Sequence, residues 1–214
     1  YTGYKDDLEL LLTYLNREGD TKVAQAVDEE WKRRVLIAHT KNKRDVPHTS
    51  DGEKDKAEIY KEYGTTLVGL MITPIFLFAF QIGDGDITYV DNTGVEEVLA
   101  ADKILGTETH SLSKADAWKK AITIVRRRTV DEKTPALFML STDGFANSYK
   151  NGDEFKKTCT DYFEMIQQHG CEVVGANLKS WLCETSEQGC GDDITLLMCY
   201  IAKDAGESEG KKNE

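Results

Sequence analysis

The sequence predicts an α+β domain in which helices pack outside an antiparallel sheet. Two segments near the start carry apolar residues at helical spacing, and two more follow in the second half of the chain. These expected helices cover residues 4–17, 24–36, 153–168 and 172–187. Short apolar segments lie between and after the two pairs, bounded by Gly, Asp, Asn and Pro, which is typical of strands in hairpins. Paired helices and strands in hairpins together indicate a layered domain with antiparallel sheet.

Length and charge limit the possible functions. The chain has 214 residues, with 27 basic and 38 acidic side chains, so its net charge is 27 − 38 = −11. A chain this acidic lacks the positive surface that nucleic acids or anionic membranes require. The length suits one domain, which we expect over residues 1–203. Residues 204–214 contain no apolar residue larger than alanine, and we expect a disordered acidic tail there.

The first half of the chain is expected to form two helices, a loop and two strands. Gly19-Asp20 separates the two helices, and the polar residues 40–58 are expected to be a surface loop. The 18 residues from Thr65 to Ile82 carry no charge, which is the bare minimum for a membrane-spanning helix. Thr73-Pro74 divides this run in two, so two buried strands joined by a tight turn fit better.

Two further strands follow at once. The turn at 83–86 leads into a strand over 87–90, and the turn at 91–94 leads into a strand over 95–99. All four strands are connected by short turns, so we expect them to pair in sequence as an antiparallel meander.

The second half of the chain is expected to hold a short helix and two more strands besides its helix pair. Residues 115–120 look helical and run into a strand over 122–125. Residues 136–141 are a buried strand, and the last strand covers 194–201. Gly170 stands where the C-terminal cap of the first paired helix belongs.

The five cysteines predict a reducing compartment. They are Cys159, Cys171, Cys183, Cys190 and Cys199. None forms a CxxC pair, and their scattered, mostly apolar surroundings favour reduced core residues of a cytoplasmic protein. Disulfides or a zinc site remain the alternative.

Three acidic turns share one local design, in which aspartate stands beside glycine at the end of an apolar strand. They are Gly83-Asp84-Gly85-Asp86, Thr142-Asp143-Gly144 and Gly191-Asp192-Asp193. Carboxylates that converge from several strand ends would suit Mg²⁺ or Mn²⁺, because hard cations prefer oxygen ligands. The alternative is that each is only a turn, since Asp-Gly is a common turn pair. An EF-hand is excluded, because the twelfth position counted from Asp84 is Val95 rather than Glu. A calcium-stabilised structural domain of another kind remains a weaker hypothesis.

The order of four motifs resembles the metal-dependent serine/threonine protein phosphatases of the PP2C (PPM) family, especially their bacterial-type branch. The motifs are Gly64-Thr65-Thr66-Leu67, Gln81-Ile82-Gly83-Asp84, Leu140-Ser141-Thr142-Asp143-Gly144 and Gly191-Asp192-Asp193-Ile194-Thr195. The resemblance covers about residues 20–202. It implies a β-sandwich of two antiparallel sheets with helix pairs on both outer faces, that is, layers in the order α-β-β-α.

The resemblance also implies a site with two or more Mn²⁺ or Mg²⁺ ions. By position, Asp143 and Asp192 resemble metal ligands of the family, and Asp84 resembles a residue near an additional, weaker metal. Gly83, Gly144 and Asp193 would support them, although the family has Asn where this chain has Asp193. The implied reaction is hydrolysis of phosphoserine or phosphothreonine in proteins by metal-activated water. The implied role is signalling against a cognate kinase, with no nucleic-acid or membrane partner.

The chain departs from the family at its start. The family begins with two strands that supply an acidic residue and a central Asp-Gly motif, which this chain lacks. Asp51-Gly52 is the only other Asp-Gly pair, but it lies in a polar loop. We expect that the chain, which begins at Tyr1 without Met, is incomplete at this end. The alternative is a catalytically inactive PP2C-like binding or regulatory module.

Two further segments could contact a substrate. Residues 145–188 would overhang the site in the family, and we hypothesise that substrate selection lies there. Arg126-Arg127-Arg128 could bind a phosphate, although a solvated strand end is the simpler interpretation.

Overall fold

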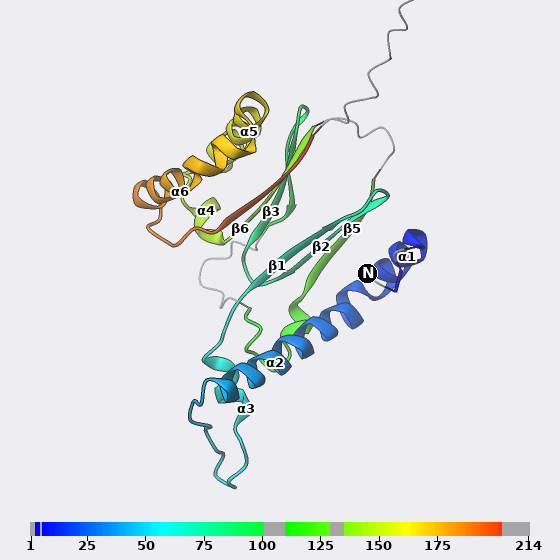
Figure 1. The fold of residues 1–214 in the computed structure, drawn as a ribbon, viewed down its shortest axis with the longest axis vertical. Coiled ribbons are helices and arrows are strands. Elements are labelled where there is room, and N and C mark those ends of the chain that lie inside the picture. Colours follow the sequence, from blue (N-terminus) through cyan, green and yellow to red (C-terminus); the bar gives the residue numbers. More distant parts are fainter. Residues whose placement is uncertain (1–2, 5, 101–109, 129–134, 203–214) are drawn as a thin grey trace, which may run out of the picture.

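The structure is a computed structural model, which describes residues 3–4, 6–100, 110–128 and 135–202. Two antiparallel sheets pack face to face, and helices cover both outer faces (Figure 1). This confirms the predicted α+β class and the α-β-β-α layering. The expected tail, 204–214, lies outside the described residues.

The first sheet has the strand order β1-β2-β5, and helices from the start of the chain cover it. Its strands are β1 (Leu67–Ile72), β2 (Phe76–Ile82) and β5 (Ile122–Arg127), and the helices are α1 (Leu8–Glu18), α2 (Ala24–Lys41) and the short α3 (Lys56–Lys61). Every residue of β2 is buried. Alternate residues of β2 point to opposite faces, so Phe76, Phe78 and Phe80 pack under α1 and α2, while Leu77 and Ala79 face the other sheet.

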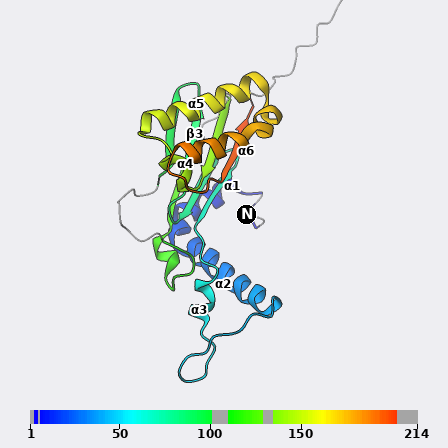
Figure 2. The ribbon, with the colours of Figure 1, turned by 90° about the vertical axis from the view of Figure 1, so that its left-hand side faces the viewer.

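The second sheet has the order β4-β3-β6-β7 and carries the helix pair from the second half of the chain. Its strands are β3 (Asp86–Asp91), β4 (Gly94–Leu99), β6 (Ala136–Ser141) and β7 (Leu196–Ile201), and the helices are α4 (Asp143–Asn147), α5 (Gly152–His169) and α6 (Cys171–Gln188). Figure 2 shows α5 and α6 lying side by side across this sheet. The α5 face that carries Phe155, Cys159 and Phe163 packs on Leu137 and Met139 of β6.

The expected four-stranded meander is wrong. β1 pairs with β2, and β3 pairs with β4, but β2 and β3 belong to different sheets. Instead, β2 pairs with β5 and β3 pairs with β6. The turn between β2 and β3 crosses the sandwich, with Gly83 at a φ of 111°. Turn residues predict that the chain reverses, but they do not say which strand it pairs with next.

Three local expectations also need correction. The expected break at Gly19-Asp20 is a π-helical turn, Gly19–Val23, that continues α1 into α2. Gly19 packs closely there, because an added Cβ would lie 3.2 Å from the Phe78 ring. Helix α3 lies at the end of the expected loop 40–58, capped by the Asp55 carboxylate, which accepts from the amides of Ala57 and Glu58. Helix α4 was also not expected.

The cysteine prediction holds in part. All five cysteines are free, but only Cys159 is buried and the other four are exposed. In the described part of the chain, no helix has the length and apolar character needed to cross a membrane.

Candidate functional site

Asp84 lies in the turn that carries the chain from one sheet to the other. Gly83 packs so closely on Thr66 that an added Cβ would lie 2.4 Å from the Thr66 Cβ. Gly85 packs on the end of β6, where an added Cβ would lie 2.7 Å from the Ser141 carbonyl oxygen. These contacts place the Asp84 turn at the end of β6 that leads into Asp143.

Asp143 follows β6 directly and is the first residue of α4. The neighbouring Thr142 has extended backbone angles, φ −69° and ψ 159°, so the strand turns into the helix at this point. The Asn147 side-chain amide donates to the Asp143 carboxylate at 3.4 Å. A carboxylate in the first helical turn is favoured by the helix dipole.

Asp192 and Asp193 lie in the segment between α6 and β7. Gly191, at a φ of 76°, supplies the left-handed turn that starts this segment. The Ser186 hydroxyl donates to the Asp192 carbonyl oxygen at 2.6 Å, and the Gly191 amide donates to the Ser186 carbonyl oxygen at 2.9 Å. The end of α6 therefore fixes the backbone of this turn.

The Asp143 and Asp192 turns are in direct contact. The Thr142 amide donates to the Thr195 carbonyl oxygen at 3.0 Å, and the Thr195 amide donates to Thr142 Oγ1 at 3.0 Å. At Gly144, an added Cβ would lie 2.7 Å from the Asp193 carbonyl oxygen and 3.4 Å from the Asp192 Cβ. No side chain larger than hydrogen fits at Gly144 unless these two segments move apart.

The charges of the three turns act on one another. Burial raises the pKa of the Asp143 carboxyl, and the Asp84 and Asp192 carboxylates raise that pKa further. Like charges interact this way only at close range, because water and salt screen distant ones. Together with the backbone contacts, this places the Asp84, Asp143 and Asp192 turns at the same end of the sandwich.

The donors fit a hard divalent cation in chemistry and in charge. Mg²⁺ is commonly held by one or two carboxylates and keeps several waters. Asp143 and Asp192, on turns in contact, would be those carboxylates. Within residues 3–4, 6–100, 110–128 and 135–202, no group of three or more His, Cys, Asp or Glu side chains is close enough to hold one ion. An ion at this site would therefore need water or further ligands.

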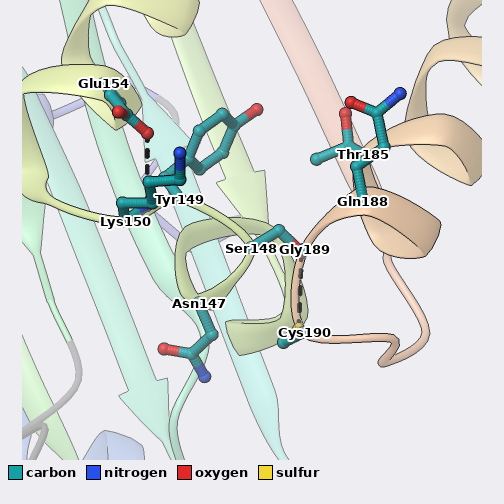
Figure 3. Close-up of a pocket in the computed structure, with 9 residues that line it drawn as sticks. All are labelled: Asn147, Ser148, Tyr149, Lys150, Glu154, Thr185, Gln188, Gly189 and Cys190. Atoms are coloured by element: carbon teal, nitrogen blue, oxygen red, sulfur yellow. Dashed lines mark hydrogen bonds between the residues drawn. The ribbon is translucent and has the colours of Figure 1, made fainter.

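A polar cavity of about 510 Å³ lies beside the Asp143 turn, between the end of α4 and the end of α6. Figure 3 shows the residues that line it: Asn147, Ser148, Tyr149, Lys150, Glu154, Thr185, Gln188, Gly189 and Cys190. The Ser148 hydroxyl donates to the Gly144 carbonyl oxygen at 2.7 Å and lies 3.4 Å from the Cys190 sulfur. The cavity is thus built partly from the segment 145–188.

A second cavity, of about 620 Å³, runs between α6 and the start of β7. Leu178, Leu182 and Leu196 line it, and Asp192 and Asp193 stand at its margin. Both cavities therefore border the aspartate turns.

The arginine run lies apart from the candidate site. Arg126 pairs with Glu96 at 2.6 Å, and Arg127 pairs with Glu9 at 2.7 Å. Arg128 donates to the Thr73 carbonyl oxygen at 3.0 Å. Because all three arginines have partners within the protein, these contacts favour a strand end without a role in binding phosphate.

Sequence reasoning missed the residues that connect the turns. Thr142 belongs to a motif quoted for its aspartate, and its own side chain was given no role. Ser186 had no signal at all, because a serine near the end of a helix is common. The contact of Gly144 with Asp193 depends on the packing of segments that are about 50 residues apart in sequence.

The chain matches a family model for protein phosphatase 2C over residues 6–183, which is more than half of its length. No curated protein matches it. Its fold is similar to that of a bacterial serine phosphatase, with a TM-score of 0.48 and 14% identity, over 69% of this chain and 67% of the other.

Two other solved structures are similar at a TM-score of 0.46. One is the catalytic domain of the serine/threonine phosphatase PstP with two manganese ions, at 12% identity over 80% of this chain and 81% of that one. The other is the Mycobacterium tuberculosis serine/threonine phosphatase PstP/Ppp, at 13% identity over 86% of this chain and 84% of that one. Because all these TM-scores lie below 0.5, the assignment rests on the sequence match. The chain belongs to the protein phosphatase 2C family.

Proposed function

We propose that this protein is a metal-dependent phosphatase that hydrolyses phosphoserine and phosphothreonine in proteins. The observation that carries the proposal is the contact between the Asp143 and Asp192 turns, through the Thr142–Thr195 hydrogen bonds and the packing of Gly144 on Asp193, with the Asp84 turn packed against the end of β6. Neighbouring carboxylates repel one another, and a divalent cation would relieve that repulsion. Membership of the protein phosphatase 2C family supports the reaction class.

In this proposal Asp143 and Asp192 bind the cation, and Asp84 contributes charge or binds an additional ion. Gly83 and Gly144 allow the close approach of the turns, and Asp193 supports Asp192 by donating its amide to the Asp192 carboxylate at 2.9 Å. Bound Mn²⁺ or Mg²⁺, in two or more ions, would activate water and neutralise phosphate charge. Residues 1–203 would form one catalytic domain in a cytoplasmic enzyme that opposes a cognate kinase in signalling.

The charge of the protein favours some substrates over others. The net charge is −11, and the cavity beside α6 is lined by Asp192, Asp193 and Glu187 against one basic residue, Lys179. Acidic peptide segments would be repelled, so basic or neutral segments around the phosphorylated residue are the proposed substrates. Residues 145–188, which line most of both cavities, are proposed to select among them.

The test is release of phosphate from a phosphothreonine peptide with basic flanking residues. We expect release with Mn²⁺ and none after EDTA. Asp143→Asn and Asp192→Asn should lower the rate by at least about a hundredfold, since each removes a charge that interacts with the ion and the developing charge. Asp51→Asn, at an exposed Asp-Gly pair, is the matched control and should keep the wild-type rate. Wild-type rates in Asp143→Asn and Asp192→Asn would rule the proposal out.

A catalytically inactive binding or regulatory module is the second candidate. The observation that favours it is the lack, among the described residues, of three ligand side chains close enough for one ion. This candidate predicts no phosphate release under any metal condition. It also predicts that phosphopeptide binding, measured by fluorescence anisotropy, is the same with Mn²⁺ and with EDTA.

A further inference from the structure

Thr142 connects the two aspartate turns through its side chain. Its hydroxyl oxygen accepts the Thr195 amide hydrogen at 3.0 Å, and the hydroxyl donates to the Asp193 carbonyl oxygen at 3.3 Å. Its amide also donates to the Thr195 carbonyl oxygen at 3.0 Å. One residue on the β6 side therefore makes three hydrogen bonds to the segment between α6 and β7.

The Thr142 hydroxyl does not cap α4, although its position at the start of that helix predicts that it would. Thr142 stands at the N-cap of α4, where a threonine side chain usually accepts from an amide of its own helix. Here the side chain makes no cap bond, and α4 begins without one. The hydroxyl is directed instead to Asp193 and Thr195, about 50 residues further along the chain.

We propose that Thr142 is a positioning residue that sets the separation of the Asp143 and Asp192 side chains. It precedes Asp143 directly, and its bonds reach the residues on both sides of Ile194, immediately after Asp192. The inference rests on the proposed function, in which both aspartates bind one cation. Thr142 itself contacts neither the cation nor the substrate; it acts through the backbone of the two turns.

The neighbouring contacts explain why a hydroxyl is needed. Gly144 lies so near the Asp193 carbonyl oxygen that an added Cβ would come within 2.7 Å of it. Without the hydroxyl, the Asp193 carbonyl oxygen and the Thr195 amide lose this partner, and a backbone group without a partner turns towards water. The segment that carries Asp192 would then move away from α4. Loss of an outer-shell hydrogen bond typically weakens metal affinity by about 10- to 100-fold.

The test compares Thr142→Val and Thr142→Ala with Thr142→Ser in the full 214-residue chain. Valine and alanine remove the hydroxyl, and alanine is included in case the second valine methyl disturbs folding. Serine keeps the hydroxyl and should behave as wild type. Thr160→Val is the matched control, because the Thr160 hydroxyl bonds only within α5, to the Lys156 carbonyl oxygen.

Two measurements by NMR separate structure from metal binding. The first is hydrogen exchange of the Thr195 amide without metal. We expect at least about tenfold faster exchange in Thr142→Val and Thr142→Ala, and no change in Thr142→Ser or Thr160→Val. The second is the Mn²⁺ concentration that broadens the amide signals of residues 143 and 192, which should rise by about 10- to 100-fold in the same two variants.

The outcomes distinguish the inference from the proposed function. Unchanged Thr195 exchange in Thr142→Val and Thr142→Ala would overturn the inference. Faster exchange with unchanged Mn²⁺ affinity would also overturn it, because the hydroxyl would then be merely structural. If Asp143→Asn leaves Mn²⁺ broadening unchanged, the proposed function fails, and the exchange rate alone then decides whether Thr142 holds the two turns together.

Discussion

The pKa of the Asp143 carboxyl is raised by the surroundings of the candidate site. Burial and the Asp84 and Asp192 carboxylates raise its pKa, so its negative charge opposes folding when no cation is bound. A cation would reverse the sign of this effect, because the same three carboxylates would then face a positive charge.

Asp143→Asn should therefore raise the melting temperature of the metal-free protein at pH 8. At pH 3, where both states of the wild-type carboxyl are largely protonated, the difference should disappear. Differential scanning calorimetry in EDTA measures the melting temperatures at pH 8 and at pH 3. Asp51→Asn, in an exposed loop, should change neither value, and a lower melting temperature for Asp143→Asn at pH 8 would contradict the account.

The Cys159 thiol gives a second prediction at the residue scale. It is fully buried, and burial raises its pKa from an ordinary value near 9 to about 12, with Glu97 and Asp86 adding to the effect. The other four cysteines are exposed. Iodoacetamide at pH 8 should modify Cys171, Cys183, Cys190 and Cys199 in the folded protein and Cys159 only after unfolding, as mass spectrometry of peptides would show.

The same shift predicts how stability changes with pH. Above pH 9 the unfolded thiol loses its proton while the folded thiol keeps it, so the folded state binds more protons. The free energy of unfolding should therefore fall as the pH rises from 9 towards 12. Urea titration of wild type and Cys159→Ala at several pH values would isolate this contribution, and equal slopes for the two proteins would argue against it.

At the scale of elements, the start of α4 and the segment after α6 depend on one small residue. Gly144 has no space for a side chain because the Asp193 carbonyl oxygen lies against it. Gly175, in the interior of α6, has no atom within 4 Å of an added Cβ other than those of its own helix backbone and chain neighbours. The two glycines therefore predict opposite effects for the same substitution.

Gly144→Ala should destabilise the protein by about 1–3 kcal/mol, as over-packing does. Gly175→Ala should stabilise it by up to about 1 kcal/mol, because alanine favours helix. Chemical denaturation of both variants measures these two changes in the free energy of unfolding. If Gly144→Ala were as stable as wild type, the close contact between these segments would be wrong.

The sequence predicted most elements but not how the strands combine. Apolar runs bounded by turn residues located every strand in the described part of the chain, because those signals are local. The crossing from β2 to β3 depends on Gly83 fitting against Thr66 and Gly85 against Ser141. These contacts join distant parts of the chain, so no local pattern could reveal them. Helix α4 has only five residues, too few for a helical period to be visible.

At the candidate site, too, local features could be predicted from the sequence and contacts between distant segments could not. The aspartates were identified from the sequence because each ends an apolar strand beside glycine. Their convergence was a hypothesis from the three similar turns, strengthened by the resemblance to a family, and their roles as ligands remain a prediction. The connection through Thr142 and Ser186 could not be predicted, because it consists of hydrogen bonds between segments brought together by the sandwich.

At the scale of the whole molecule, stability comes from three apolar interfaces between four layers. Leu137 of β6 is fully buried between its sheet and α5, whereas Leu197 of the edge strand β7 is 57% exposed. Both are leucines on neighbouring strands of one sheet. The burial of each side chain in the sheet, rather than its residue type, sets what each contributes.

Leu137→Ala should lower the free energy of unfolding by about 2–5 kcal/mol, because it leaves a cavity under α5. Leu197→Ala should cost less than about 1 kcal/mol, since little of its surface is removed from water on folding. Urea unfolding followed by circular dichroism compares them. Equal losses would contradict the burial of Leu137 under α5 and the exposure of Leu197 on the edge strand.

The central claim is that Asp143 and Asp192 bind one divalent cation. Isothermal titration calorimetry with Mn²⁺ tests it most directly, on wild type, Asp143→Asn, Asp192→Asn and the Asp51→Asn control. The account predicts binding to wild type and to the control, and affinity at least about tenfold weaker in each of the other two variants. No binding to wild type, or equal affinity in all four proteins, would contradict it.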